Sequence, residues 1–133
     1  MNQKPLALII DDHEPIREIL KLGLTELAGF KVVEATDGPS GIYAASEHEP
    51  DLILLDWMMP RMNGIEVLEI LKSRHETKKT PVFMLTRNDL MGEVEQAVEA
   101  GAVGYFTKPI NIRELCTRIK TSFQHEITNQ KGF

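Results

Sequence analysis

The stretch from Asp51 to Gly64, with the sequence DLILLDWMMPRMNG, decides how the rest of the chain is interpreted. Its four consecutive apolar residues, Leu52 to Leu55, predict a strand that is buried on both faces, as in a parallel sheet. The apolar run stops at Asp56, and Pro60 then marks a loop before a helical pattern resumes. A carboxylate at the end of a buried strand is poorly hydrated and easily approached by a metal ion. We therefore interpret Asp56 as a nucleophile.

The composition is that of a single globular domain. The 133 residues are 42% hydrophobic and 26% charged, and the formal net charge is −5. With this charge we expect no direct contact with nucleic acid, because nothing in the chain could neutralise many phosphates. The sequence has neither an apolar run of membrane-spanning length nor a signal-peptide core, so we expect no membrane attachment. The single Cys116 excludes an internal disulfide and suits a reducing, cytoplasmic location.

Apolar runs alternate with helical patterns from one end of the chain to the other. The runs predict strands over residues 6–10, 31–35, 52–55, 82–85 and 102–107. The patterns between them predict helices over about 14–28, 40–48, 64–74 and 89–100, and a last helix that Asn111 and Glu114 begin with a capping box. We expect the domain to span residues 1–126, with a short polar tail at 127–133 and no output domain.

Five strands that alternate with five helices require crossover connections, and hence a mainly parallel sheet that is covered on both faces. The predicted fold is α/β and flavodoxin-like, a (βα)5 three-layer sandwich with strand order 2-1-3-4-5 and a binding site at the carboxyl ends of the strands.

Trp57 is expected to be partly exposed. Helical spacing predicts inward-facing residues in the first, fourth and last helices: Ile16, Ile19, Leu20, Leu24 and Leu27; Val94, Ala97 and Val98; Ile112, Leu115, Cys116, Ile119 and Phe123.

Polar residues stand at the carboxyl ends of four predicted strands. Asp11 and Asp12 follow the first strand, Asp56 the third, Thr86 the fourth and Lys108 the fifth. Because the carboxyl ends of parallel strands lie on one edge of the sheet, we expect these groups to converge. Three carboxylates in one crevice need a counter-charge, since two unit charges ~4 Å apart repel by ~4 kcal/mol at an effective dielectric of ~20.

A hard divalent cation supplies that counter-charge best, because its ligands are oxygens and the chain has no Cys or His cluster for zinc. We predict that Asp12 and Asp56 contact Mg²⁺, or Mn²⁺ in its place, and that Asp11 does so directly or through water. His13, beside the acid pair, is interpreted as a solvated loop side chain.

Such a site suits phosphoryl transfer. The metal and Lys108 would hold the phosphoryl oxygens while Asp56 attacks in line to give an aspartyl phosphate. The hydroxyl of Thr86 could reach a phosphoryl oxygen only after that group is attached. Thr86 would then draw the following loop inward and act as a sensor.

Four segments resemble the receiver domain of two-component response regulators, the CheY-like superfamily. They match it in order and spacing: the acid pair Asp11-Asp12, DWMMPRMNG at 56–64, MLT at 84–86 and YFTKP at 105–109. The resemblance covers the chain from about residue 5 to residue 124. One such motif would be a weak signal, but four in register are specific.

The resemblance implies that Asp56 is the phosphoacceptor of a two-component system or phosphorelay, phosphorylated by a sensor histidine kinase or a histidine phosphotransfer protein. It also implies that Met58 gives its backbone carbonyl to the metal and that Lys108 contacts the phosphoryl group. Pro109 would follow Lys108 in a cis peptide.

The resemblance further implies how the phosphoryl group acts at a distance. Tyr105 would turn inward when Thr86 moves, which remodels the face made by the fourth helix, fifth strand and fifth helix for an unidentified downstream protein. The chain would be a monomer or a phosphorylation-dependent dimer, either standing alone or part of a larger regulator. Its chemistry would be self-catalysed phosphotransfer and autodephosphorylation, so we do not expect an enzyme that acts on a metabolite.

One residue departs from the family pattern, and three other functions fit the sequence less well. The residue after the Thr86 position is usually small, and here it is Arg87, which we interpret as a modulator of phosphoryl lifetime. A haloacid-dehalogenase-type hydrolase needs an acid where this chain has Met58. A flavin carrier needs a Ser/Thr/Gly-rich loop where residues 11–15 read DDHEP, and a degenerate receiver would not need the complete acid, threonine and lysine set.

Overall fold

The computed structural model describes residues 4–87 and 91–130, and only the backbone of residues 91, 93 and 124–130. Strands and helices alternate along the chain. In order they are β1 (Leu6–Ile10), α1 (Glu14–Leu27), β2 (Lys31–Ala35), α2 (Gly38–His48), β3 (Leu52–Asp56), α3 (Gly64–Ser73), β4 (Val82–Arg87), α4 (Met91–Glu99), β5 (Gly104–Lys108) and α5 (Ile112–Gln130).

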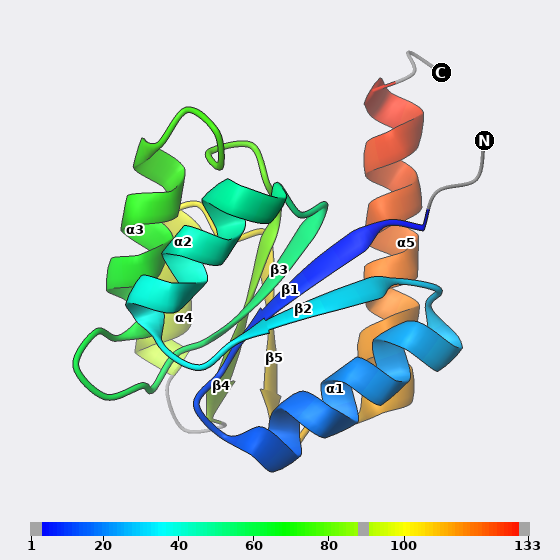
Figure 1. Ribbon diagram of the computed structural model, residues 1–133, viewed down its shortest axis with the longest axis horizontal. Helices are drawn as coiled ribbons and strands as arrows, with labels where there is room; N and C mark the ends of the chain where they lie inside the picture. Colours follow the sequence, from blue (N-terminus) through cyan, green and yellow to red (C-terminus); the bar gives the residue numbers. More distant parts are fainter. Residues whose placement is uncertain (1–3, 88–90, 131–133) are drawn as a thin grey trace.

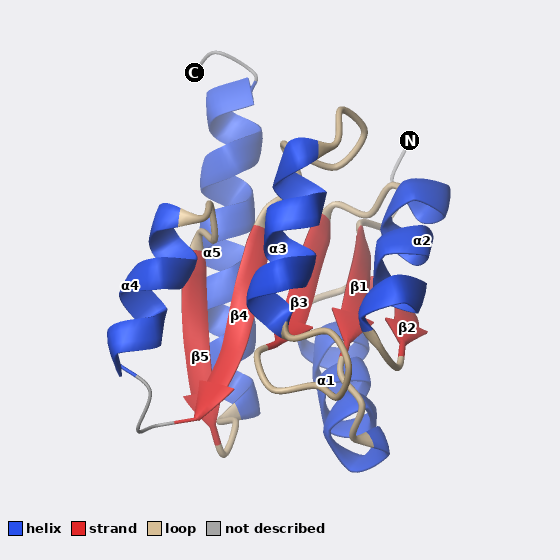
Figure 2. Ribbon diagram, turned by 90° about the vertical axis from the view of Figure 1, so that its left-hand side faces the viewer, coloured by secondary structure: helices blue, strands red, loops and turns tan. Residues whose placement is uncertain are grey.

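The strands form one parallel sheet of order β2-β1-β3-β4-β5 (Figure 1). Helices α2, α3 and α4 cover one face of the sheet, and α1 and α5 cover the other (Figure 2). The flavodoxin-like three-layer fold and its strand order are therefore confirmed.

Strand β3 lies at the centre of the sheet, and all five of its residues are buried. Its side chains alternate between two cores: Ile53 and Leu55 pack with α2 and α3, and Leu52 and Leu54 pack with α1 and α5. Burying an aliphatic side chain of this size contributes roughly 1.5–3 kcal/mol. A strand with two buried faces is a rigid support for the carboxylate of Asp56 at its end.

Two residues fix the loop between β3 and α3: Gly64, which bonds back to the start of the loop, and Asn63, which caps the first turn of α3. The Gly64 N–H donates to the Trp57 carbonyl over 2.8 Å, and a Cβ on Gly64 would collide with the Asp56 carbonyl oxygen. Asn63 then begins α3, accepting from the Glu66 N–H over 3.0 Å while the Glu66 carboxylate accepts from the Asn63 N–H. The absence of a side chain at Gly64 lets α3 begin directly against the end of β3.

Four expected exposures are wrong. Trp57 is 5% exposed. Its backbone N–H donates to the Leu85 carbonyl, so the pairing with β4 continues one residue past β3 and the indole packs into the core. Three residues expected on inner faces lie in solvent: Ile19, Leu27 and Val98 are 52%, 44% and 54% exposed.

On helix α1, the stripe of buried residues is narrower than the stripe of apolar residues. Its buried stripe follows Leu20, Gly23 and Leu24. A Cβ on Gly23 would collide with Ile112, so α5 packs closely along this stripe and leaves the flanking apolar residues outside. The stripe expected on α5 is correct, with Leu115, Cys116 and Ile119 buried.

The element ends differ from those expected by a few residues. Strands β3 and β4 extend through Asp56 and Arg87, and α2 begins at Gly38. The expected start of α4 at residue 89 lies outside the described residues, and α5 continues to Gln130, past the expected domain end at 126. Across residues 4–87 and 91–130, no helix combines the length and apolarity that a bilayer crossing requires.

Candidate functional site

Strand order brings the polar strand ends together. Strand β1 pairs with β3 through Ile10 and Leu55, so the residues that follow them, Asp11 and Asp56, stand at neighbouring strand ends. Strand β3 pairs in turn with β4, and β4 with β5, and all strands run in the same direction (Figure 2). The polar residues predicted at the carboxyl ends therefore lie along one edge of the sheet.

Lys108 joins two of the carboxylates. Its Nζ donates to Asp56 Oδ1 over 2.9 Å and to Asp11 Oδ2 over 3.3 Å. The two carboxylates are 2% and 0% exposed, and the lysine side chain is 19% exposed. A residue from the fifth strand is thus bound to residues from the third and first, as the sequence analysis predicts.

Burial sets the protonation of these groups. Desolvation raises the pKa of Asp56 to about 6, against hydrogen bonds from Lys108 and from the Met58 backbone that lower it. Burial acts to lower the pKa of Lys108, but its hydrogen bonds and ionic contacts with Asp56 and Asp11 outweigh it, so that pKa is raised. At neutral pH the site therefore holds a charged lysine beside a mostly ionised Asp56.

The carboxylates also suit a divalent cation. One ligand atom from each of Asp11, Asp12, His13 and Asp56 lies within 4.8 Å of all the others. Among the described residues, the only buried side-chain atoms without a hydrogen-bond partner are Asp12 Oδ1 and Asp56 Oδ2. Buried carboxylate oxygens with free lone pairs are the ligands that Mg²⁺ prefers. The cluster could therefore bind such an ion.

Sequence reasoning missed Arg17, which holds the acid loop. Its Nη1 donates to the Asp11 carbonyl over 2.8 Å, and its Nε donates to Glu34 Oε1 of β2 over 3.0 Å. The side chain is 12% exposed, and Lys21 Nζ lies 3.6 Å from Glu34 Oε2. No motif in the sequence indicates this contact, because Glu34 approaches Arg17 only through the pairing of β2 with β1.

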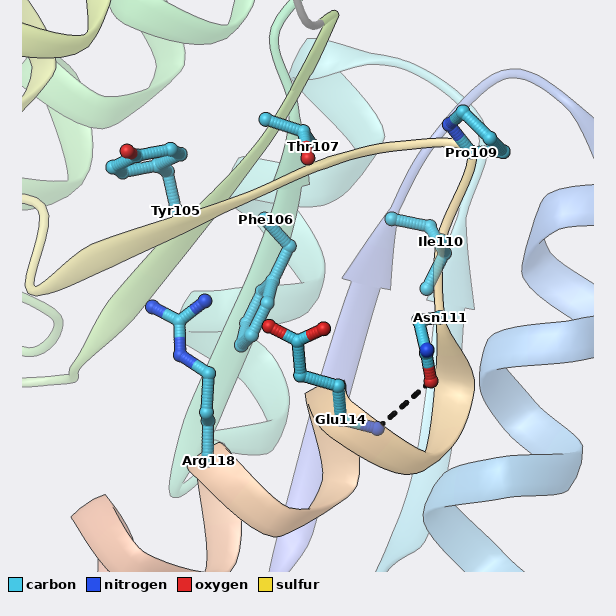
Figure 3. Close-up of a pocket in the computed structure, with 8 residues that line it drawn as sticks. All are labelled: Tyr105, Phe106, Thr107, Pro109, Ile110, Asn111, Glu114 and Arg118. Carbon is cyan, nitrogen blue, oxygen red and sulfur yellow. Dashed lines mark hydrogen bonds between the residues drawn. The ribbon is translucent and has the colours of Figure 1, made fainter.

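The two expected switch residues lie on neighbouring strands. Thr86 is 1% exposed, and its Oγ1 donates a long hydrogen bond of 3.4 Å to the Arg87 carbonyl. Tyr105 is half-buried against the α2–α3–α4 core. Figure 3 shows its ring on the opposite side of β5 from Phe106, which packs beneath the guanidinium of Arg118. Tyr105 therefore lies on the same side of the sheet as α4.

The remaining expected residues have these positions. Arg87 has an exposed side chain and is paired in register with Lys108. The side chain of Met58 is 52% exposed, and the backbone of this residue forms a hydrogen bond with Asp56. The peptide bond between Lys108 and Pro109 is cis, as the resemblance implies.

Comparisons with known proteins agree with this geometry. Residues 7–120 match the family of the response regulator receiver domain. The chain is 42% identical over 113 residues to the phosphate regulon transcriptional regulatory protein PhoB of Pseudomonas aeruginosa, covering 85% of this chain and 49% of the relative. It is 39% identical over 120 residues to the alkaline phosphatase synthesis transcriptional regulatory protein PhoP of Bacillus subtilis, covering 90% of this chain and 48% of the relative. The chain thus spans about half the length of these relatives.

Solved structures show the same architecture over almost their whole length. The Vibrio cholerae chemotaxis protein CheY4 superposes with a TM-score of 0.83 at 28% identity, covering 90% of this chain and 98% of that one. The receiver domain of the Francisella response regulator 1452 gives a TM-score of 0.83 at 30% identity, covering 92% and 99%. The chain therefore belongs to the family of response regulator receiver domains.

Proposed function

We propose that this chain is a phosphorylation-controlled switch of a two-component system or phosphorelay, with Asp56 as the phosphoacceptor. One observation carries the proposal: of the two oxygens of the buried Asp56, Oδ1 is held by Lys108, and Oδ2 has no hydrogen-bond partner among the residues that the structure describes. A carboxylate that is fixed at one oxygen and free at the other is oriented for in-line attack. The donor is a phosphohistidine of a sensor kinase or a phosphotransfer protein.

The reaction exchanges one bond to phosphorus for another. A carboxylate oxygen of Asp56 forms a bond to phosphorus as the phosphorus–nitrogen bond of the donor breaks, and the leaving imidazole nitrogen takes a proton. Lys108 holds the carboxylates of Asp56 and Asp11 in place, and it remains positively charged as negative charge accumulates on the phosphoryl group. A pKa of about 6 keeps most of Asp56 ionised, and hence nucleophilic, at neutral pH.

The residues that would hold a divalent cation are Asp11, Asp12, Asp56 and the Met58 carbonyl. Mg²⁺ or Mn²⁺, when bound, supplies positive charge to the carboxylates and to the phosphoryl oxygens. Transfer and later hydrolysis are reactions of the protein on itself, so we propose a switch and not an enzyme of metabolism, acting in the cytoplasm.

The signal leaves through β4 and β5. Thr86 pairs with Thr107 and Met84 pairs with Tyr105, so a shift of Thr86 toward a phosphoryl oxygen pulls on the strand that carries Tyr105. We assign the output surface to α4, β5 and α5. Phosphorylation shifts the equilibrium between the inactive and active conformations of this surface. The size of that shift is limited by how differently the two conformations bind the phosphoryl group.

The partner of this surface is a protein whose identity the relatives do not define. PhoB and PhoP are named as transcriptional regulators, and the chain matches about half of each. With a net charge of −5, this domain is proposed to act through protein contacts rather than on nucleic acid itself. It would do so as a monomer or as a dimer that forms on phosphorylation.

The proposal is tested by titrating the chain with Mg²⁺ and beryllofluoride, a phosphoryl mimic, while Trp57 fluorescence is recorded. Trp57 is the only tryptophan, is buried, and follows Asp56 directly. We expect a saturable change in fluorescence that requires both Mg²⁺ and beryllofluoride. A response of the same size in Asp56→Asn would refute the assignment of Asp56.

A further inference from the structure

His13 brings a nitrogen atom to the edge of the carboxylate cluster. Its Nδ1 lies 3.4 Å from Asp12 Oδ1 and 3.6 Å from Asp11 Oδ1. Adjacent ligands of an octahedral cation, each ~2.1 Å from the metal, are ~3 Å apart. Only a small movement of the imidazole would therefore place Nδ1 at ligand distance from a cation that the acid pair also contacts.

The side chain of His13 is free to make that movement. It is 62% exposed, and although His13 is the N-cap of α1, its side chain makes no capping hydrogen bond. The backbone is held separately, because the His13 N–H donates to Asp11 Oδ1 over 2.8 Å. The imidazole can therefore turn toward the cluster without loosening the start of the helix.

An independent observation indicates that the cluster accepts a ligand. Asp56 is 2% exposed, and within residues 4–87 and 91–130 its Oδ2 has no hydrogen-bond partner although it belongs to a carboxylate of this cluster. A buried carboxylate oxygen of this kind favours a cation in front of it. The choice of cation then depends on the remaining ligands, and imidazole suits nickel and zinc whereas magnesium takes oxygen.

We propose that His13 is a nitrogen ligand for divalent transition cations such as Ni²⁺ or Zn²⁺ at this site, and that it leaves Mg²⁺ to the oxygen ligands. The inference rests on the proposed function, because it uses the same carboxylates. It makes His13 a residue that determines metal specificity. A transition cation held by His13 and the acid pair excludes Mg²⁺ from the site.

The test compares Ni²⁺ and Mg²⁺ binding to the whole chain by calorimetry. Quenching of Trp57 fluorescence by paramagnetic Ni²⁺ is recorded in parallel, since Trp57 adjoins Asp56 and reports binding at this site. The variants are His13→Phe, which keeps a ring but removes the ligand, and His48→Phe, a matched control at an exposed histidine that ends α2. We expect His13→Phe to weaken Ni²⁺ binding roughly tenfold or more, with Mg²⁺ binding changed by less than about twofold.

Two outcomes in His13→Phe would overturn the inference. One is unchanged Ni²⁺ affinity in His13→Phe. The other is an equal loss of Ni²⁺ and Mg²⁺ affinity, which would make His13 a support of the loop rather than a ligand. Both differ from failure of the proposed function, in which wild-type protein would show no Mg²⁺-dependent response to beryllofluoride. A loss in His48→Phe as large as in His13→Phe would also contradict the assignment.

Discussion

Asp56 should destabilise the metal-free protein, and its replacement by Asn should reveal by how much. The pKa of Asp56 is about 6 in the folded chain, against 3.8 for an unperturbed aspartic acid, and burial is the main cause. Because each pKa unit corresponds to ~1.4 kcal/mol, ionised Asp56 lowers the free energy of unfolding by about 3 kcal/mol. Asn is uncharged at all pH values and has nearly the same shape, so Asp56→Asn removes this cost.

The sign of the pH dependence follows from the direction of the pKa shift. Between pH 3.8 and about 6 the folded state binds more protons at this site than the unfolded state. The wild-type protein therefore loses stability as the pH rises through this window, and the loss is complete above it. The difference between wild type and Asp56→Asn therefore reports on Asp56 together with its charge interactions with Asp11 and Lys108.

The measurement is urea unfolding in EDTA, followed by circular dichroism from pH 4 to pH 8. Asp56→Asn should match the wild type near pH 4 and exceed it by up to about 3 kcal/mol at pH 7. Adding Mg²⁺ should then stabilise the wild type by mass action and leave Asp56→Asn nearly unaffected. Parallel stability curves for the two proteins across this range would refute the claim that Asp56 is ionised and poorly solvated.

Three further substitutions test the supports of the site. Arg17→Ala removes the donor to the Asp11 carbonyl and should weaken Mg²⁺ binding roughly tenfold, with partial rescue in Arg17→Lys. If calorimetry shows unchanged Mg²⁺ affinity in Arg17→Ala, Arg17 does not position the acid loop. Gly64→Ala places a methyl group against the Asp56 carbonyl and should cost about 1–3 kcal/mol in urea unfolding. The control Gly92→Ala, whose Cβ would meet no described atom within 4 Å, should cost nothing and gain up to about 1 kcal/mol of helix propensity. Arg87→Ala should speed dephosphorylation several-fold if the guanidinium shields the phosphoryl group, and an unchanged rate by phosphate release would remove Arg87 from the site.

The sheet and the convergence of Asp11, Asp56 and Lys108 could be predicted because each depends on a local signal. A short apolar run bounded by polar residues indicates a buried strand, and parallel strands necessarily place their carboxyl ends on one edge. The charges at those ends are thus neighbours in any sheet that keeps β1 and β5 within reach of β3. Lys108 reaches both carboxylates as expected.

What could not be predicted depends on contacts between elements. The partner of Arg17 is on β2, and only the lateral pairing of β1 with β2 brings Glu34 beside it. Trp57 is buried because the ladder with β4 continues one residue beyond β3, which no spacing rule reveals. Ile19 has the periodicity of an inner residue, but the width of the covered stripe on α1 is set by how closely α5 approaches at Gly23.

The central claim is tested most directly by locating the phosphoryl group. The chain is incubated with a small phosphodonor such as acetyl phosphate in Mg²⁺, the acyl phosphate is trapped by borohydride reduction, and the modified peptide is identified by mass spectrometry. The account predicts modification at Asp56 alone, abolished by EDTA and absent in Asp56→Asn. Modification at another residue, or modification of Asp56 that persists without a divalent cation, would contradict it.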